Sequence, residues 1–386
     1  MQCRVVTIGV LTSAEVSRLE LGPGISARSP RLPSGMSAVS PHAERPLSLL
    51  DFVDIPPGLT ASEAMQRTVR TAQAADRLGY HRYWISEHHS FVGLASSSPE
   101  ILISHIAGAT TGIRVGAAGI MLPNHAPLKV AEWFRTLEML HPGRIDLGLG
   151  RAPGTDQVTA FALRHSRDGA TGVPDFPQQA AELIAFLTDS WPAGHPFAKV
   201  VATPVVDTQP ELLMLGSSGW GSAFAAANGM TSVFAHHMSP ELAIDALRAY
   251  RRDFQPSELG AEPHVIVSAL ALATHDPAVA DDFRAGWALS MRNIRRGETM
   301  RPTIEEIRAF RLSDEYAGIA PGLEGRVFAG EPAVVAKQLA ALAEAAGADE
   351  ITVVAPTPDQ QAKLASLELL ATEWGLQPRS LPADQV

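Results

Sequence analysis

The sequence predicts an α/β protein built as a single (β/α)8 TIM barrel, with long insertions after strands four and seven. Three observations predict this fold. From Pro46 onward, short β-type runs alternate with longer amphipathic runs, which is typical of βαβ units in a parallel sheet. The β-type runs number eight, and eight strands close such a barrel. The length of 386 residues suits one barrel, because these barrels commonly hold about 250 residues and some exceed ~400.

We expect residues 1–45 to be a disordered N-terminal extension, residues 46–376 to form the barrel and residues 377–386 to be a flexible C-terminal tail. The extension has a short apolar run, Val5–Leu11, followed by prolines and serines without packing periodicity. A signal peptide is the alternative, but the run is short for one and no clean small-residue cleavage site follows. The segment is also compatible with an overlong start assignment, with Met36 as the first residue.

The predicted strands are the β-type runs that turn residues bound. In chain order they are Leu47–Phe52, Arg82–Ser86, Arg114–Met121, Arg144–Leu149, Glu211–Leu215, Ser232–Ala235, Val265–Leu272 and Glu350–Ala355.

Helical periodicity fills the intervals between these strands. Ala61–Leu78 has small and apolar residues near helical spacing and ends at Gly79, a common helix stop. Ala126–Leu140 begins with Pro127 in its first turn and carries an apolar stripe. Three further segments follow the same pattern: Pro240–Phe254, Pro332–Ala346 and Asp359–Trp374.

Two connections are too long for simple crossovers, residues 150–210 after strand four and residues 274–330 after strand seven. Long loops in a compact barrel are usually functional. Because both follow the C-terminal ends of strands, where barrel active sites lie, we expect residues 152–172 and 292–325 to line the substrate pocket.

The composition excludes several functional classes. The net charge is −10, which repels a nucleic-acid backbone. No stretch approaches the ~20 apolar residues of a membrane-spanning helix, so no membrane partner is expected. The single cysteine, Cys3, leaves no internal disulfide framework and no cysteine-rich metal site, and we expect a cytoplasmic protein.

Glu87-His88-His89 at the end of strand two is the first candidate motif. Imidazoles titrate near neutral pH and ligate metals, so the pair suggests acid–base chemistry or a metal site. The spacing argues against a metal, because successive strand residues point to opposite faces and the two rings should diverge. The alternative is that both histidines are hydrogen-bonded structural residues at a strand end.

Small residues on strand three and at the end of strand four form a second candidate. Gly116-Ala117-Ala118-Gly119 leaves room for a planar ring system close to the backbone, although it could also only relieve crowding inside the barrel. Strand four ends in Gly150, which makes space, and Arg151, whose forked cation suits a phosphate or carboxylate. Arg144, at the opposite end of that strand, is assigned a structural role.

The loop after strand five is the third candidate. It reads Gly216-Ser217-Ser218-Gly219-Trp220-Gly221-Ser222 and leads into an alanine-rich helix. Glycines let backbone N–H groups turn inward, serines add hydroxyl donors, and a helix N-terminus favours an anion. The mechanism is that of a phosphate cradle, although the loop matches neither the Walker pattern nor a dinucleotide fingerprint. A capped turn before a helix is the alternative.

Taken together, these segments resemble the luciferase-like flavin-dependent monooxygenases, the family of the bacterial luciferase subunits and the alkanesulfonate monooxygenases. The order of the motifs carries the resemblance. Glu-His-His ends strand two and Gly-Ala-Ala-Gly-Ile-Met-Leu-Pro fills strand three; Ala-Pro-Leu-Lys-Val-Ala-Glu then begins a helix, and Pro-Gly-Arg-Ile-Asp-Leu-Gly-Leu-Gly-Arg follows on strand four. The resemblance covers about residues 46–374.

The resemblance implies a barrel that takes reduced FMN from a separate NAD(P)H:flavin reductase, reacts it with O2 and oxidises a small organic substrate through a flavin C4a-peroxide. It implies His88 as the catalytic acid or base, and Ala118 and Gly119, joined by a non-proline cis peptide bond, beneath the flavin ring. It assigns the flavin phosphate to Arg151 and to the loop residues Ser217, Ser218, Gly219 and Ser222. It implies no metal, and a homodimer, because family members are often dimers.

Two departures limit what carries over. Luciferase has a cysteine where this chain has Gly150, so light emission and aldehyde specificity are not expected. Luciferase also has an acidic residue where this chain has Ser217. Related barrels use the deazaflavin F420, so an F420-dependent oxidoreductase that transfers hydride without O2 is the first alternative; Glu-His-His favours FMN. A flavin-binding paralogue without turnover is the second alternative, and a metal-dependent hydrolase the third. The sequence does not identify the substrate.

Overall fold

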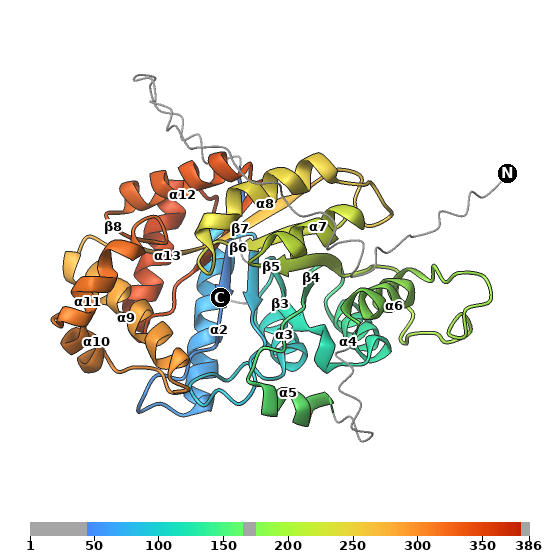
Figure 1. The fold of residues 1–386 in the computed structure, drawn as a ribbon, viewed down its shortest axis with the longest axis horizontal. Coiled ribbons are helices and arrows are strands. Elements are labelled where there is room, and N and C mark those ends of the chain that lie inside the picture. The colour runs from blue at the N-terminus through green and yellow to red at the C-terminus, as the bar shows by residue number, and fades with distance from the viewer. Residues whose placement is uncertain (1–44, 165–174, 380–386) are drawn as a thin grey trace.

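The computed structural model describes residues 45–164 and 175–379. It is an α/β barrel, with the strands in the centre and the helices outside (Figure 1). The strands are β1 (Leu47–Asp51), β2 (Arg82–Ile85), β3 (Arg114–Met121), β4 (Ile145–Gly150), β5 (Glu211–Gly216), β6 (Thr231–Ala235), β7 (Val265–Ala273), β8 (Val327–Gly330) and β9 (Glu350–Val354). The predicted N-terminal extension, apart from residue 45, and most of the predicted tail lie outside the described residues.

Eight parallel strands close the barrel. From β1 to β7 each strand pairs with the next, β9 pairs with β1, and β7 pairs with β9 to complete the ring. These eight strands are the eight that the sequence predicts, which confirms the (β/α)8 fold. The ninth strand, β8, was not predicted. It pairs with the second half of β7, while β9 pairs with the first half, so β8 adds to the sheet without being needed to close it.

Helices cover the barrel between successive strands. The predicted helices correspond to α2 (Ala61–Leu78), α4 (Pro127–Leu140), α8 (Pro240–Asp253), α12 (Pro332–Ala346) and α13 (Gln360–Trp374). Local chemistry sets the ends of α2, because Thr60 and Glu63 form a capping box and Gly79 ends the helix with φ 90°. The other helices are α3 (Pro99–Gly108), α5 (Gln157–Arg164), α6 (Phe176–Thr188), α7 (Gly219–Ala227), α9 (Pro277–Arg295), α10 (Ile304–Arg311) and α11 (Asp314–Ile319), with short turns η1 (Leu122–Asn124) and η2 (Ala320–Leu323).

Both long connections contain helices. Between β4 and β5 lie α5 and α6, and between β7 and β8 lie α9, α10 and α11. None of the helices in the described ranges has the length and apolar composition that a membrane crossing requires.

The barrel core is one of two buried apolar clusters. Side chains that point inward, such as Trp84, Leu213 and Ile266, form a cluster that continues into α9 through Trp287. Side chains that point outward from the same strands form the second cluster, between the barrel and its helices. Because alternate residues of each strand belong to different clusters, the strands bury both faces, as expected for a parallel barrel.

Charged groups close the N-terminal end of the barrel. Arg82 forms ion pairs with Asp146 at 3.1 Å, Glu211 at 2.8 Å and Glu350 at 3.1 Å. Arg144 donates to the backbone carbonyl groups of residues 107, 110 and 113, which confirms the structural role expected for it. Chemistry is therefore expected at the other end of the strands.

Candidate active site

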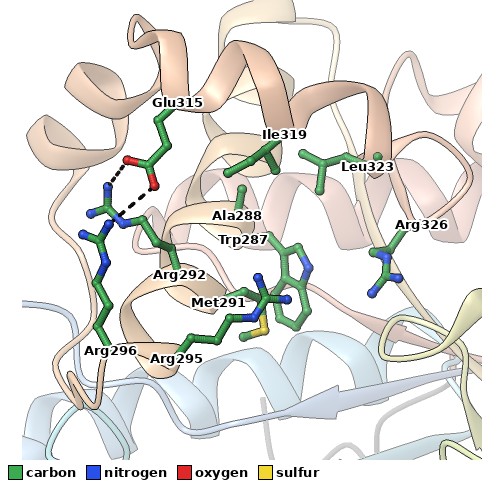
Figure 2. Close-up of a pocket in the computed structure, with 11 residues that line it drawn as sticks. Trp287, Ala288, Met291, Arg292, Arg295, Arg296, Glu315, Ile319, Leu323 and Arg326 are labelled. Atoms are coloured by element: carbon green, nitrogen blue, oxygen red, sulfur yellow. Dashed lines mark hydrogen bonds and ion pairs between the residues drawn. The ribbon is translucent and has the colours of Figure 1, made fainter.

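The C-terminal ends of β2, β3, β4 and β5 are neighbours in the sheet. The predicted site residues follow or lie in these four strands, so the closed sheet arranges them along one arc of the same barrel end. A pocket of about 460 Å³ borders the end of the barrel nearer to β6 and β7 (Figure 2). Its lining residues lie between positions 287 and 326, all in the connection between β7 and β8, and several belong to the segment 292–325 that the sequence analysis expects at the substrate pocket.

His88 is a half-buried histidine just beyond β2. Its Nδ1 lies 3.0 Å from the hydroxyl oxygen of Ser86, and its ring packs edge-on against Phe52 at 5.9 Å. Burial, together with the positive charge of Arg301, lowers the pKa of His88 to about 4. The imidazole is therefore neutral near pH 7, and Ser86 fixes its orientation through Nδ1.

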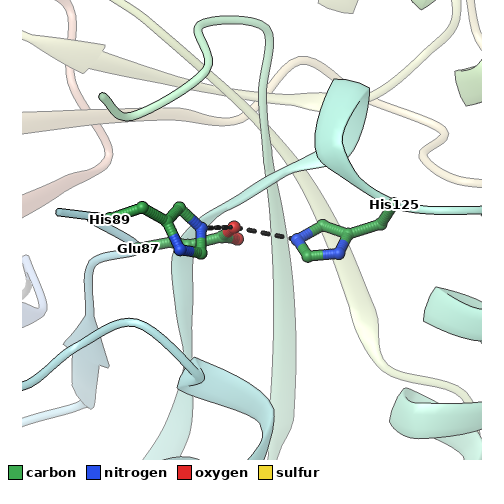
Figure 3. A group of neighbouring side chains, drawn as sticks. All are labelled: Glu87, His89 and His125. Atoms are coloured by element: carbon green, nitrogen blue, oxygen red, sulfur yellow. Dashed lines mark hydrogen bonds and ion pairs between the residues drawn. The ribbon is translucent and has the colours of Figure 1, made fainter. Parts of the chain in front are cut away.

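Glu87 joins two histidines from different segments (Figure 3). Its carboxylate accepts hydrogen bonds from His89 Nε2 at 2.6 Å, His125 Nε2 at 2.8 Å and the backbone N–H of Met121 at 2.8 Å. An ionised carboxylate only accepts, so both imidazoles carry their proton on Nε2. Burial alone would raise the pKa of Glu87, but the hydrogen bonds from His125 and His89 lower it to about 2.

The two adjacent histidines have different partners, which confirms their predicted divergence: His88 contacts Phe52 and Ser86, and His89 contacts Glu87. The sequence analysis included Glu87 in the Glu-His-His motif without assigning it a role, and it did not select His125. The atoms of Glu87, His89 and His125 that could ligate a metal all lie within 4.8 Å of one another. The position of Glu87 directly before His88 was a usable signal, whereas the contact with His125 depends on the tertiary fold.

Close backbone contact between β3 and β4 explains the small residues there. The peptide bond between Ala118 and Gly119 is cis, as the resemblance implied, and the pairing register shifts between Ala117 and Ile120. A Cβ atom on Gly119 would lie 2.7 Å from the carbonyl oxygen of Gly148. Glycine is therefore required for strand packing, while Ala118 faces the barrel interior with 7% of its surface exposed.

Gly150 makes space, as expected from the sequence, and a neighbouring side chain uses that space. A Cβ atom at this position would lie 2.8 Å from the sulfur of Met121, so the space at the end of β4 is filled by that side chain. The glycine makes room for strand packing, and the sequence could not show which neighbour uses the room.

Arg151 and the start of α7 lie together. The guanidinium carbon of Arg151 is 4.2 Å from the ring centre of Trp220, in the first turn of α7. The Trp220 ring also stacks with the ring of Phe224, with 5.3 Å between their centres. The fold therefore brings an exposed cation from the end of β4 next to the N-terminus of a nine-residue helix.

The residues of the predicted phosphate cradle differ in how deeply they are buried at the start of α7. Ser218 is the N-cap residue, yet its hydroxyl makes no capping hydrogen bond. No atom would lie within 4 Å of a Cβ on Gly219, so the approach to the first-turn N–H groups is open there. Ser217 is half-buried beside them. Ser222 is 3% exposed and accepts a hydrogen bond from Ser232 at 3.2 Å, so it lies beneath the surface of the cradle.

The connection after β7 also reaches the β1 and β2 ends of the barrel. Arg301 pairs with Asp54 at 2.5 Å, and the backbone N–H of Gly93 donates to the carbonyl oxygen of Thr299 at 2.8 Å. Arg301 also faces the ring of Phe52, the same ring that packs against His88. Asp54 and Arg301 were not selected from the sequence, because their contact joins segments more than 200 residues apart in the chain.

Comparisons with known proteins place these features in a family. The model of the family described as luciferase-like monooxygenase matches residues 46–350. A luciferase-like monooxygenase of Escherichia coli strain K12 is 38% identical over 324 residues, which cover 83% of this chain and 95% of that protein. An N-acetyl-S-alkylcysteine monooxygenase of Bacillus subtilis is 38% identical over 234 residues, which cover 60% of this chain and 69% of that protein.

Solved structures show the same fold. The crystal structure of apo-MsnO8 is 35% identical, with a TM-score of 0.78, and the match covers 88% of this chain and 100% of that one. Two more distant structures share the fold alone. One is the oxygenating constituent of 3,6-diketocamphane monooxygenase from Pseudomonas putida with FMN, at 22% identity, TM-score 0.61 and 86% and 97% coverage. The other is an F420-dependent secondary alcohol dehydrogenase, at 14% identity, TM-score 0.62 and 85% and 98% coverage.

Proposed function

Because the chain belongs to the luciferase-like monooxygenases, we propose that it uses reduced FMN and O2 to oxidise a small organic substrate. The observation that carries this proposal is the pairing of Arg151 with the uncapped start of α7. A cation and free backbone N–H groups at one point form a site for a dianionic phosphate, which FMN has.

The residues present fit the phosphate of FMN. Arg151 supplies a forked donor, Gly219 leaves the helix N-terminus open, and the hydroxyl groups of Ser217 and Ser218 lie at the same turn. Ser222 supports the turn from below through Ser232. Trp220 holds the Arg151 guanidinium near the anion by a cation–π contact.

The other end of the arc fits a flat ring. Ala118 has only a methyl side chain, which faces the barrel interior, and His88 lies just beyond the neighbouring strand β2. Reduced FMN supplies the electrons that activate O2 when it is bound. His88, neutral and oriented by Ser86, is proposed to accept or donate a proton at Nε2 beside the ring, and Glu87 fixes the segment that carries it.

Two partners follow from this proposal. A separate NAD(P)H:flavin reductase would supply reduced FMN, as the resemblance to the family implies. We also propose a cytoplasmic homodimer. F420 is the alternative cofactor, since it would bring an anionic tail to the same cradle and carry out hydride transfer without O2. Glu-His-His at residues 87–89 favours FMN.

An isotope experiment tests the chemistry. The chain is incubated with FMN, NADH, a flavin reductase, 18O2 and a panel of organic substrates that begins with N-acetyl-S-alkylcysteines, the compounds named for the Bacillus relative. The proposal predicts one 18O atom per molecule of product, and loss of product with His88→Asn. Oxidation of a panel member without 18O incorporation, supported by oxidised F420 as the hydride acceptor and not by FMN, would instead assign the chain to the hydride-transfer branch.

A further inference from the structure

The pocket beside β6 and β7 combines an apolar floor with an unusual concentration of arginines. Trp287 and Met291 from α9, together with Ile319 and Leu323 from the α11–η2 region, supply apolar surface. The lining also includes four arginines and one acid, Glu315. Its volume of about 460 Å³ lies in the range of small-molecule sites, which are mostly apolar with a few placed polar groups.

Two of the arginines share one carboxylate in the pocket wall and are only partly neutralised. Glu315 pairs with Arg292 at 3.0 Å and with Arg296 at 3.7 Å, as the dashed lines in Figure 2 show. Arg292 also lies 4.8 Å from the ring centre of Phe310. These contacts fix the wall, but one carboxylate is shared by two guanidinium groups, so positive charge remains.

Of the other two arginines, Arg295 is available to a ligand and Arg326 is partly engaged by the protein. Arg295 has no hydrogen-bond or ion-pair partner within residues 45–164 and 175–379, and Figure 2 shows its side chain extending from α9 toward the middle of the pocket. Arg326 lies on the opposite side of the view and donates to the carbonyl oxygens of His237 at 3.2 Å and Met238 at 3.0 Å. Among the described residues, the acid that pairs with Arg326 is Glu241, at 3.7 Å and 64% exposed.

The pocket is connected to the barrel end that holds the candidate active site. The ring of Trp287 contacts that of His237, directly after β6, at 6.0 Å. Trp287, Leu323 and Ala118 belong to the same buried apolar cluster. A ligand whose apolar part lies on Trp287 would therefore approach the barrel mouth from the side of β6 and β7, next to the strand β5 that precedes the phosphate cradle.

We propose that this pocket selects the substrate by binding the carboxylate of an organic acid to Arg295, with Arg326 adding positive charge and the apolar part of the acid resting on Trp287 and Met291. A planar guanidinium binds a carboxylate through two parallel hydrogen bonds. The chain as a whole carries a net charge of −10, whereas the pocket lining holds four arginines and one acid. The assignment of this acid as the substrate rests on the proposed monooxygenase function.

Calorimetric titration of the flavin-free chain at low ionic strength tests the pocket by itself. The probes are the carboxylates from hexanoate to decanoate, with octan-1-ol as the neutral match for octanoate. We expect a carboxylate to bind and octan-1-ol to bind at least tenfold more weakly. Arg295→Gln should weaken carboxylate binding roughly tenfold, the effect of losing one charge-assisted contact, and Arg295→Glu should weaken it further. Arg248→Gln removes an equal charge from an exposed arginine of α8 outside the pocket and should leave the affinity unchanged.

Three results would overturn the pocket assignment: no carboxylate binds, octan-1-ol binds as tightly as octanoate, or Arg248→Gln has the same effect as Arg295→Gln. A parallel anaerobic titration with reduced FMN separates this failure from failure of the proposed function. Loss of carboxylate binding with intact FMN binding refutes only the pocket. Carboxylate binding without affinity for FMN retains the pocket as an organic-acid site and refutes the monooxygenase.

Discussion

Replacement of Glu87 by glutamine should destabilise the protein, because three hydrogen bonds converge on this fully buried carboxylate. Glutamine has nearly the same shape but offers one acceptor oxygen and one donor group. If the oxygen accepts from His89 and His125, the new amide N–H₂ faces the backbone N–H of Met121. One buried donor then loses its partner.

Two routes give a similar magnitude. A buried donor left without a partner costs about 1–3 kcal/mol. The pKa of Glu87 falls from 4.5 to about 2, and at about 1.4 kcal/mol per pH unit this corresponds to roughly 3 kcal/mol. We therefore expect Glu87→Gln to lower the free energy of unfolding by about 2–3 kcal/mol at pH 7.

The pH dependence has a defined sign. Because the pKa of Glu87 is lower in the folded state, its contribution is complete above about pH 4.5 and disappears as the pH falls toward 2. Equilibrium urea unfolding of the wild type and Glu87→Gln at several pH values measures this, with Glu344→Gln, an exposed glutamate of α12, as the matched control. A Glu87→Gln protein within about 0.5 kcal/mol of the wild type at pH 7, or a difference that stays constant down to pH 3, would refute the hydrogen-bonding account.

Three further predictions concern the site. His88→Asn should lower turnover by about 10²–10⁴-fold with little change in affinity for reduced FMN. Because the pKa of His88 is about 4, the pH–rate profile between pH 5 and 8 should have the same shape in the variant as in the wild type. Unchanged turnover would favour a non-catalytic paralogue. Arg151→Ala should weaken binding of reduced FMN about tenfold or more in a fluorescence titration but leave riboflavin, which has no phosphate, nearly unaffected; equal losses would refute phosphate binding. Gly119→Ala should lower the free energy of unfolding by about 1–3 kcal/mol, because the new Cβ would lie 2.7 Å from the carbonyl oxygen of Gly148. Gly318→Ala is the control, because a Cβ on Gly318 would have no atom within 4 Å and should not lower the stability. Urea unfolding of both variants is the test, and equal stabilities would contradict the predicted contact.

Alternation of strand and helix signals made the barrel predictable, since each closing strand is an apolar run bounded by turn residues. The end of the barrel that holds the site was predictable too, because residues after parallel strands meet at one edge. Strand β8 could not be found this way. Its four residues, Val327–Gly330, lie inside a long connection and depend on pairing with the second half of β7.

The candidate site was predictable where its signals are local in the sequence. The glycine and serine loop before α7 and Arg151 after β4 each suggested a phosphate site from their own residues, and the fold brings them together. Contacts between distant segments were not predictable. The hydrogen bond from His125 to Glu87 and the ion pair between Arg301 and Asp54 each join segments that carry no mark of their partner.

Anaerobic titration of the purified chain with reduced FMN and, separately, with reduced F420 tests the central claim most directly. We expect saturable binding of reduced FMN that weakens with Arg151→Ala, weaker binding of F420, and oxidation of the bound FMN when O2 is admitted. Tight binding of F420 together with no affinity for reduced FMN would contradict the claim and make the chain a hydride-transferring member of the same fold.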